Sequence, residues 1–378
     1  TGSIGGSLIN IIKKDKNKFK VVLITANKNY KKLIKQTNFF NIKNIIITDT
    51  KSYLITKKIL KNKSINIYNN FDCLKKIFKD NKIDYTMSAI SGFDGLKPTL
   101  DIIRYTRVIA IANKESIICG WDLINKNLKK FNTKFIPVDS EHFSIWSLIN
   151  NAKNSDIEKV FITASGGPFH DYPLNRFKSI TKKLALKHPN WKMGQKITID
   201  SATMMNKVFE IIEAKKIFDL DYNKLSILVH PKSYVHALIK FTNGLTKILI
   251  HDTDMKIPIF NSIYSDFEKS LKTKKIDFNI INKLNFSKIK RNRFPVVKLL
   301  DILPDKDSLF ETVIVSANDK LVELFLDNQI KYLDISKILL KILLKNEFIK
   351  FKKKKAKNID EIMNLNQYVR FKIESFCV

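Results

Sequence analysis

The sequence predicts an α/β fold that begins with a parallel sheet covered by helices on both faces and ends in a helical domain. Two observations support this prediction. Over about the first hundred residues, short apolar runs rich in β-branched residues alternate with helical patterns. From Phe294 onward, apolar residues recur at helical spacing. With 378 residues, the chain is also long enough for two or three domains.

Four apolar runs in the first part are typical of buried strands, at residues 21–25, 44–47, 85–90 and 108–112. The chain opens with TGSIGGSLINII, a glycine-containing turn that leads into a helix. The backbone N–H groups of such a segment can receive a dinucleotide pyrophosphate. A strand normally precedes this turn, and none does so here. We therefore expect the first strand of the sheet to be missing, through a trimmed or misassigned start.

The net charge of +32 comes mostly from lysines that are spread along the whole chain, with a dense run at residues 352–355. Such a charge is also found in proteins that bind nucleic acids, because basic side chains neutralise phosphates. The even spread, together with heavy use of Ile, Asn and Phe, favours a solvated lysine surface. A basic nucleic-acid-binding protein on an α/β scaffold is the competing hypothesis.

No apolar stretch is long enough to predict a membrane span. The three cysteines, Cys73, Cys119 and Cys377, are far apart and lack CxxC spacing. They therefore indicate neither a disulfide framework nor a thiolate metal site, and they favour a reducing compartment.

The segment PVDSEH places two carboxylates, Asp139 and Glu141, two residues apart. In an extended segment both side chains would point to the same side, and such a pair can chelate a hard cation. For an isolated pair of this kind, two acids exposed at the end of a strand are the commoner case. A third carboxylate elsewhere is needed to favour a metal site.

The segment DSATMMNKVFE predicts a helix that begins at Asp200 or Ser201, each a good N-cap residue. On that helix Asn206, Lys207 and Glu210 share one face. An amide, an ammonium group and a carboxylate near a helix N-terminus suit a site that binds both a phosphate and a metal ion. An ordinary surface salt bridge between Lys207 and Glu210 is the equally weighted alternative.

Three carboxylates without a Cys or His cluster favour Mg²⁺ or Mn²⁺ over zinc. These ions prefer oxygen ligands and leave coordination positions open to water and substrate. Calcium is less favoured, because the sequence lacks a dedicated calcium loop.

Two further segments follow predicted strands. VIAIANKES places Asn113, Lys114 and Glu115 just beyond the carboxyl end of a strand, where open α/β sheets bind ligands. A lysine there can neutralise charge on a developing enediolate, although a lysine at the start of a helix is the commoner interpretation. ASGGPF leads from a strand into a Gly-Gly turn that leaves Ser165 and free backbone amides available to an anion.

The segment HPNWKMG has the composition of a loop that covers a site, with Trp191 and Met193 as lid residues and Gly194 as a pivot. A single tryptophan is more often part of a core than of a lid. The neighbouring Pro, Asn and Gly favour a loop here.

An ordered set of motifs covers residues 1–236: TGSIG, ANKES, PVDSEH, SGGPF, HPNWKMG, DSATMMNK with Glu210, and HPKSYVH. In this order and spacing the set resembles the 1-deoxy-D-xylulose 5-phosphate reductoisomerase family, enzymes of the non-mevalonate isoprenoid route. The likeness continues more weakly through DMKIP, FPVVKL and SANDK, and so covers essentially the whole chain.

The resemblance implies a subunit of three domains and a linker. These are a Rossmann-like NADPH-binding domain over residues 1–138, an α+β catalytic and dimerisation domain over 139–263, a linker over 264–290 and a helical C-terminal domain over 291–378. It also implies a homodimer with neither a membrane nor a nucleic-acid partner. The expected compartment is the bacterial cytoplasm, with a plastid-type organelle as the alternative.

The resemblance further implies roles for individual residues. Asp139, Glu141 and Glu210 would ligate Mg²⁺ or Mn²⁺, and Lys114 would join them in catalysis. The residues implied to bind the sugar phosphate are Ser140, Glu141, Ser165, His188, Ser201, Asn206 and Lys207. Those implied to contact NADPH are Thr1, Gly2, Ser3, Ile4, Lys28, Asn29, Asn113, Glu115 and Gly194.

The implied reaction rearranges 1-deoxy-D-xylulose 5-phosphate to a branched aldehyde, which NADPH reduces to 2-C-methyl-D-erythritol 4-phosphate. Two residues depart from the family's pattern. Asn27 stands where glycine is usual before Lys28, and Lys192 occupies the variable position of the lid. A related NADPH oxidoreductase that acts on another sugar phosphate is the alternative function.

Overall fold

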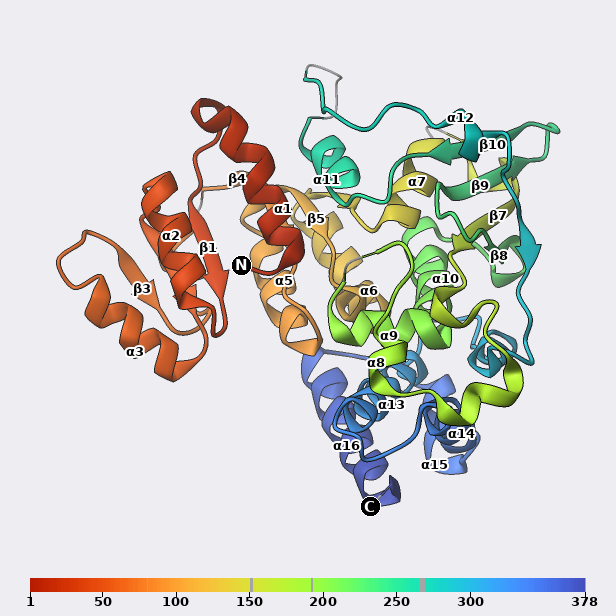
Figure 1. The fold of residues 1–378 in the computed structure, drawn as a ribbon. Coiled ribbons are helices and arrows are strands. Elements are labelled where there is room, and N and C mark those ends of the chain that lie inside the picture. The colour runs from red at the N-terminus through yellow and green to blue at the C-terminus, as the bar shows by residue number, and fades with distance from the viewer. Residues whose placement is uncertain (80, 150–151, 192, 265–268, 378) are drawn as a thin grey trace.

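The computed structural model describes residues 1–79, 81–149, 152–191, 193–264 and 269–377. Its first part contains two parallel sheets of three strands each (Figure 1). The strands of one sheet are, in order, β1 (Leu23–Ala26), β2 (Asn44–Ile47) and β3 (Asn66–Tyr68). Those of the other are β4 (Ile83–Ser88), β5 (Thr106–Ile111) and β6 (Lys134–Pro137).

Helices connect these parallel strands, as the α/β prediction requires. They include α2 (Tyr30–Phe40), α3 (Thr50–Ile59), α5 (Leu96–Ile103) and α6 (Lys114–Lys130). The four predicted strands correspond to β1, β2, β4 and β5. Strand β3 was not predicted, because it has only three residues and none is fully buried, which leaves no readable pattern.

The middle of the chain forms a five-stranded mixed sheet in the order β10-β9-β7-β8-β11. Its strands are β7 (Ile157–Ala164), β8 (Leu225–Val229), β9 (Val235–Phe241), β10 (Thr246–Ile250) and β11 (Ser287–Lys288). Strand β7 is parallel to β8 and antiparallel to β9. Helices α7 (Ser140–Ile149) and α10 (Met205–Phe218) pack against this sheet, which gives the predicted α+β arrangement.

The segment DSATMMNKVFE contains the junction of two helices rather than the start of one. Helix α9 (Gln195–Thr203) ends there and α10 begins, with Met204 between them in a left-handed conformation at φ 71°. Asp200 and Ser201 therefore lie in the last turn of α9, and the prediction that a helix begins at either residue was wrong. The left-handed conformation costs about 1–2 kcal/mol, and the burial of Met204 and Met205 in the core offsets it.

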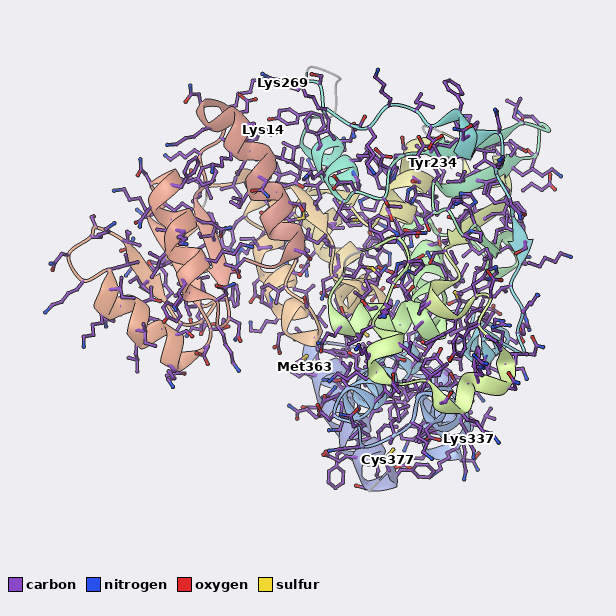
Figure 2. All side chains as sticks on the ribbon, in the orientation of Figure 1. Lys14, Tyr234, Lys269, Lys337, Met363 and Cys377 are labelled. Carbon is purple, nitrogen blue, oxygen red and sulfur yellow. The ribbon has the colours of Figure 1, made fainter. Side chains whose placement is uncertain are left out.

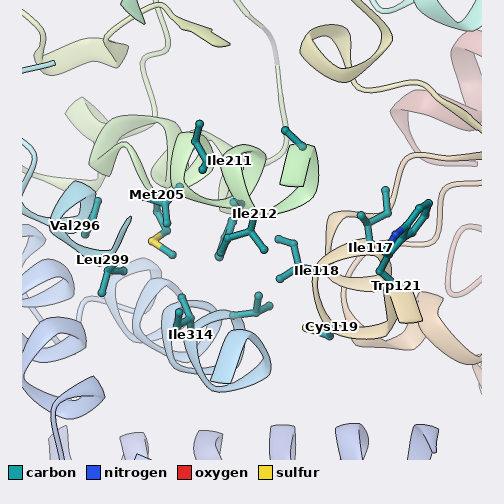
Figure 3. Packing of buried hydrophobic residues seen from close by; sticks show 14 of the residues in the cluster. Ile117, Ile118, Cys119, Trp121, Met205, Ile211, Ile212, Val296, Leu299 and Ile314 are labelled. Carbon is teal, nitrogen blue, oxygen red and sulfur yellow. The ribbon is translucent and has the colours of Figure 1, made fainter. Parts of the chain in front are cut away.

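Helices make up the last part of the described chain, as predicted. They include a 3-10 turn at Pro295–Asp301, α13 (Phe310–Leu326), α14 (Tyr332–Leu343), α15 (Asn346–Ile349) and α16 (Ile359–Cys377). One buried cluster joins Ile118 on α6, Ile212 on α10 and Ile314 on α13 (Figure 3). The first, middle and last parts of the chain thus share a continuous core. The predicted domain boundaries stay predictions.

Side chains that end in nitrogen, drawn in blue, extend outward around the molecule in the view of Figure 2. Of the labelled lysines, Lys14 and Lys269 lie in the upper part of this view and Lys337 lies at the lower right. This spread agrees with the interpretation of the charge as a solvated lysine surface. None of the helices in the described ranges combines the length and the hydropathy that a membrane crossing needs.

Candidate active site

The first turn of α6 carries Asn113, Lys114 and Glu115 at the carboxyl end of β5, as predicted. Asn113 is the N-cap: its Oδ1 accepts a hydrogen bond from the backbone N–H of Ser116 at 2.6 Å. Its amide nitrogen also donates to the carbonyl of Ile90 at 2.7 Å and to Glu115 Oε2 at 3.0 Å. The buried Asn113 side chain therefore holds the helix start against the loop after β4.

The pair Asp139 and Glu141 lies at the start of a helix, which corrects the extended geometry expected from the sequence. Strand β6 ends at Pro137, and α7 begins at Ser140. The Asp139 carboxylate accepts a hydrogen bond from the Glu141 N–H at 3.2 Å, and this turn starts the helix. The hydroxyl of Ser140 donates to the Glu141 carboxylate.

The third carboxylate, Glu210 on α10, meets the other two despite its distance in the sequence. Asp139, Glu141 and Glu210 can each offer one oxygen, and these oxygens lie within 4.8 Å of one another. Asn206, one turn earlier on α10, donates to Glu210, while its Oδ1 is buried without a hydrogen-bond partner in the described structure. Three hard carboxylate donors and a free amide oxygen suit a divalent cation such as Mg²⁺ or Mn²⁺.

Two lysines compensate the charge of this carboxylate group. The Lys114 ammonium lies 2.7 Å from Asp139 Oδ2 and 3.7 Å from Glu210 Oε1. The Lys207 ammonium lies 2.5 Å from Glu141 Oε1 and also contacts Glu210. The alternative of an ordinary surface pair between Lys207 and Glu210 was wrong, because both side chains are buried and Lys207 also pairs with α7.

Burial and charge together shift the pKa values of these groups. Burial by itself would raise the pKa of Asp139, but the adjacent Lys114 ammonium holds it well below its usual range. Burial and the neighbouring Glu141 carboxylate raise the pKa of Glu210 to about 8. Burial would lower the pKa of Lys207, yet the carboxylates of Glu141 and Glu210 raise it. A divalent cation would favour the ionised form of all three carboxylates.

The sequence reasoning missed two buried residues beside this group, His142 and Glu213. His142 Nε2 lies 2.9 Å from the backbone oxygen of Glu210, and its Nδ1 lies 3.4 Å from Asp139 Oδ1. Glu213 Oε2 lies 3.2 Å from the Lys114 ammonium. A signal was available for Glu213, since it follows Glu210 by three residues on a predicted helix and so shares its face. None was available for His142, because the segment that contains Asp139 was expected to be extended.

A second group of predicted residues gathers where β7 ends. Ser165 Oγ lies 3.2 Å from His188 Nε2 and accepts a hydrogen bond from the Gly167 N–H at 3.0 Å. Gly167 has a φ of +64°, and a Cβ atom there would lie 2.8 Å from the carbonyl oxygen of Ser201. Glycine is therefore required for the turn to approach the end of α9. The turn that carries Ser165, which contacts His188, thus lies against the backbone of Ser201. The role of these three residues in substrate binding stays a prediction.

The segment around His188 is a loop between two helices, as its composition predicted. His188 Nδ1 accepts hydrogen bonds from the N–H groups of Asn190 at 3.1 Å and Trp191 at 2.9 Å. The Asn190 amide donates to the carbonyl of Pro231 at 2.7 Å. The Trp191 ring meets the His236 ring edge-on with 6.2 Å between centroids. Met193 is half-buried, and Lys192 lies outside the described residues.

The start of the chain and the turn after β1 lie side by side. Helix α1 (Ser3–Ile12) includes Ile4 and follows Gly2, its N-cap. The Lys32 ammonium donates to the Thr1 carbonyl at 2.8 Å, and the Lys32 N–H donates to Asn29 Oδ1 at 3.2 Å. Lys28 and Asn29 are exposed. Six of the residues predicted to contact the dinucleotide thus lie around two neighbouring helix N-termini.

Asn27 occupies the position where the family pattern has glycine. Its backbone φ is not positive, so the turn does not require glycine. Its side-chain amide donates to Thr48 Oγ1 at 2.8 Å. The asparagine therefore links the turn after β1 to the end of β2.

Three family models match nearly the whole chain. The model described as 1-deoxy-D-xylulose 5-phosphate reductoisomerase matches residues 1–120. The C-terminal domain model of the same name matches residues 135–218. The model described as DXP reductoisomerase C-terminal domain matches residues 250–372.

Curated relatives and solved structures agree with these models. The chain is 65% identical over 379 residues to the 1-deoxy-D-xylulose 5-phosphate reductoisomerase of Pelagibacter ubique, covering 100% of this chain and 98% of the relative. It is 37% identical to that of Clostridium novyi, covering 98% and 95%. The Zymomonas mobilis enzyme solved with NADPH has a TM-score of 0.87 at 31% identity, covering 100% and 97%. A DOX-P reductoisomerase solved with NADPH, fosmidomycin and magnesium has a TM-score of 0.90 at 29% identity, covering 100% and 96%.

Proposed function

The chain belongs to the 1-deoxy-D-xylulose 5-phosphate reductoisomerase family, and on this premise we infer that it converts 1-deoxy-D-xylulose 5-phosphate to 2-C-methyl-D-erythritol 4-phosphate. The reaction uses NADPH and a divalent metal ion, both present in the solved relatives. The observation that carries this inference in the structure is the convergence of Asp139, Glu141 and Glu210 from two helices.

We propose that these three carboxylates hold Mg²⁺ or Mn²⁺. When bound, the ion supplies Lewis acidity and a template for the substrate's carbonyl and hydroxyl oxygens, while NADPH supplies hydride. Asn206 Oδ1 is a further oxygen that faces no partner in the described structure. Ser140, which now donates to Glu141, is in position to exchange that hydrogen bond for one to a substrate oxygen.

Lys114 and Lys207 are the two lysines of the site, and we propose a different role for each. Lys207, with Asn206, Ser165, His188 and Ser201, forms the proposed phosphate pocket, because ammonium, amide and hydroxyl donors all bind phosphate oxygens. We assign Lys114 to the reacting carbons, where its charge stabilises an enediolate-like transition state. Its contacts with Asp139 and Glu213 hold the ammonium in place.

We propose that NADPH lies across the two helix N-termini of the first domain and reaches the site along α6. The residues proposed to contact it are Thr1, Gly2, Ser3, Ile4, Lys28, Asn29, Asn113, Glu115 and Gly194. Helix N-termini bind phosphates through free N–H groups and the helix dipole. The exposed Lys28 suits the 2′-phosphate that distinguishes NADPH from NADH.

We further propose a homodimer that forms through β10. This strand is at the edge of the five-stranded sheet, and Leu245, Ile248 and Ile250 beside or within it are exposed. An exposed apolar edge strand pairs readily with another strand, and a second copy of the chain offers an identical edge.

The bacterial cytoplasm is the proposed compartment, since all three cysteines are unpaired.

Oxidation of NADPH at 340 nm tests the proposed activity. The purified chain is mixed with NADPH, Mg²⁺ or Mn²⁺ and 1-deoxy-D-xylulose 5-phosphate, and product formation is followed by mass spectrometry. We expect turnover that stops when the metal is chelated. The same assay with other ketose and aldose phosphates tests the alternative substrate. Absence of turnover with 1-deoxy-D-xylulose 5-phosphate, or faster turnover of another sugar phosphate, would contradict the proposal.

A further inference from the structure

Lys196, in the first turn of α9, is the centre of an ion-pair cluster outside the metal site. Its ammonium lies 3.0 Å from Asp200 Oδ2 on the same helix, 3.0 Å from Asp319 Oδ1 on α13 and 3.2 Å from Glu115 Oε1 on α6. The ammonium also lies 5.2 Å from the centre of the Phe209 ring on α10. One side chain therefore connects helices from the first, middle and last parts of the chain.

The carboxylates of this cluster have further fixed partners. Glu115 accepts a hydrogen bond from Asn113, the N-cap of α6. The Asn318 amide donates to Asp200 Oδ1 at 2.7 Å. Side-chain exposure is only 2% for Asp200, 11% for Glu115 and 13% for Asp319. A buried carboxylate that loses its cation is destabilised, so Lys196 compensates the charge of three carboxylates that come from three helices.

The cluster stands between the loop that contains His188 and the start of α6. Lys196 follows Gly194 by two residues, so it anchors the end of that loop. Its partner Glu115 adjoins Lys114, which contacts Asp139 in the metal site. The neighbouring residues Lys114 and Glu115 of α6 therefore belong to different clusters. Lys114 contacts the carboxylates of the proposed metal site, and Glu115 contacts Lys196.

We propose that Lys196 is a positioning residue for NADPH binding. Through its ion pair with Glu115, Lys196 holds the end of the 187–194 loop next to the N-terminus of α6. This inference rests on the proposed function, because Glu115 and Gly194 are proposed NADPH contacts. Lys196 itself touches neither cofactor nor substrate. It fixes the relative position of two segments that do, so that binding energy is not spent on ordering them.

The charge balance of the cluster supports this role. Three carboxylates surround one ammonium group, and burial together with Glu115 and Asp200 raises the pKa of Asp319 to about 7. Burial would lower the pKa of Lys196, but Asp200, Asp319 and Glu115 raise it well above the usual value. Removing the ammonium leaves the carboxylates repelling one another across three helices.

The test is a direct NADPH titration, followed by the fluorescence of the cofactor, with Lys196→Met, Lys196→Arg and a matched control. Lys216 supplies the control, because it is a buried lysine on α10 that pairs with Asp307 and Glu311 away from the site. We expect Lys196→Met to weaken NADPH binding about tenfold. Lys196→Arg should bind within about twofold of the wild type, since it keeps the charge and the reach to carboxylates.

The control separates positioning from general destabilisation. Lys216→Met should lower the melting temperature but leave the NADPH Kd unchanged. Three outcomes would each overturn the proposal. The NADPH Kd of Lys196→Met could equal that of the wild type, Lys216→Met could weaken NADPH binding as much as Lys196→Met does, or Lys196→Arg could bind NADPH as weakly as Lys196→Met. Wild-type protein that fails to bind NADPH would overturn the proposed function instead. If Lys196→Met does not fold, Lys196→Gln removes the charge but keeps a polar side chain, and it is compared with Lys216→Gln. A loss of NADPH affinity in Lys196→Gln alone is expected, and no loss, or an equal loss in both variants, would overturn the proposal.

Discussion

Lys207 and Glu141 form an ion pair across the site, with 2.5 Å between Nζ and Oε1, although 66 residues separate them in the chain. The pair joins α10 to the first turn of α7 and so fixes the two helices that bring the carboxylates together. It also places the lysine proposed to bind the phosphate directly beside a carboxylate proposed to bind the metal ion.

Replacing Glu210 by glutamine should lower kcat/KM by about a hundredfold or more, because it removes one charged oxygen ligand from the metal site. The fold should persist, since glutamine keeps the volume and the hydrogen bond from Asn206. Steady-state kinetics with Mg²⁺ and Mn²⁺ provide the measurement. Glu311→Gln is the control, because Glu311 is equally buried but pairs with Lys216. Full activity in Glu210→Gln would remove this residue from the site.

Mg²⁺ or Mn²⁺ should raise the melting temperature of the protein. The ion binds the folded carboxylate group and not the unfolded chain, which contributes about 2.7 kcal/mol when its free concentration is about 100 times the Kd. A thermal shift titration measures this effect, and chelation should reverse it. The same shift in Asp139→Asn and in wild type would show that the ion binds elsewhere.

Replacing Asn113 by alanine should destabilise the protein by about 1–2 kcal/mol, because the buried amide caps α6. Urea unfolding measures the loss. Asp49 caps α3 by accepting from the Ser52 N–H at 2.8 Å, and it provides the comparison. Because Asn113 also donates to Ile90 and Glu115, its loss should exceed that of Asp49→Ala. Equal losses would mean that these additional hydrogen bonds contribute nothing.

His188 should remain neutral down to about pH 4. Burial and the charge of Lys207 lower the pKa of His188 to about 4 from the usual 6.5. Because the unfolded chain binds the proton more readily, this group contributes stability above pH 6.5 that is lost as the pH falls toward 4. Histidine NMR titration, assigned with His188→Asn, gives the pKa directly. A pKa near 6.5 would contradict the hydrogen bonds that Nδ1 accepts from Asn190 and Trp191.

Replacing Ile248 by lysine should dissociate the proposed dimer. A charge on the exposed face of the edge strand β10 opposes pairing with a second copy. Light scattering after size-exclusion chromatography gives the mass of each variant. Leu54→Lys is the control, since Leu54 is an exposed apolar residue on α3. A monomeric wild type, or a dimer that persists in Ile248→Lys, would contradict an interface at β10.

The sequence by itself determined the class of fold and the residue types available to the candidate site. Alternating apolar runs predict parallel βα units because strand and helix have different side-chain periods. The motifs around Asn113, Asp139, Ser165 and Glu210 indicate which ligands the site could bind, because hard carboxylates and phosphate-binding donors are recognisable as residue types.

Only the tertiary structure decided which of these residues meet and at what geometry. Sequence spacing could not distinguish a buried ion pair of Lys207 from a surface pair, because burial depends on the packing of α7 against α10. It also missed the break at Met204, where burial in the core overrides the local preference for a continuing helix. Sequence spacing could indicate only the pair of Lys196 with Asp200, four residues later on α9. The other partners of Lys196 lie 81 residues upstream on α6 and 123 residues downstream on α13 (196 − 115 and 319 − 196). Contacts at such separations are set by how the helices pack.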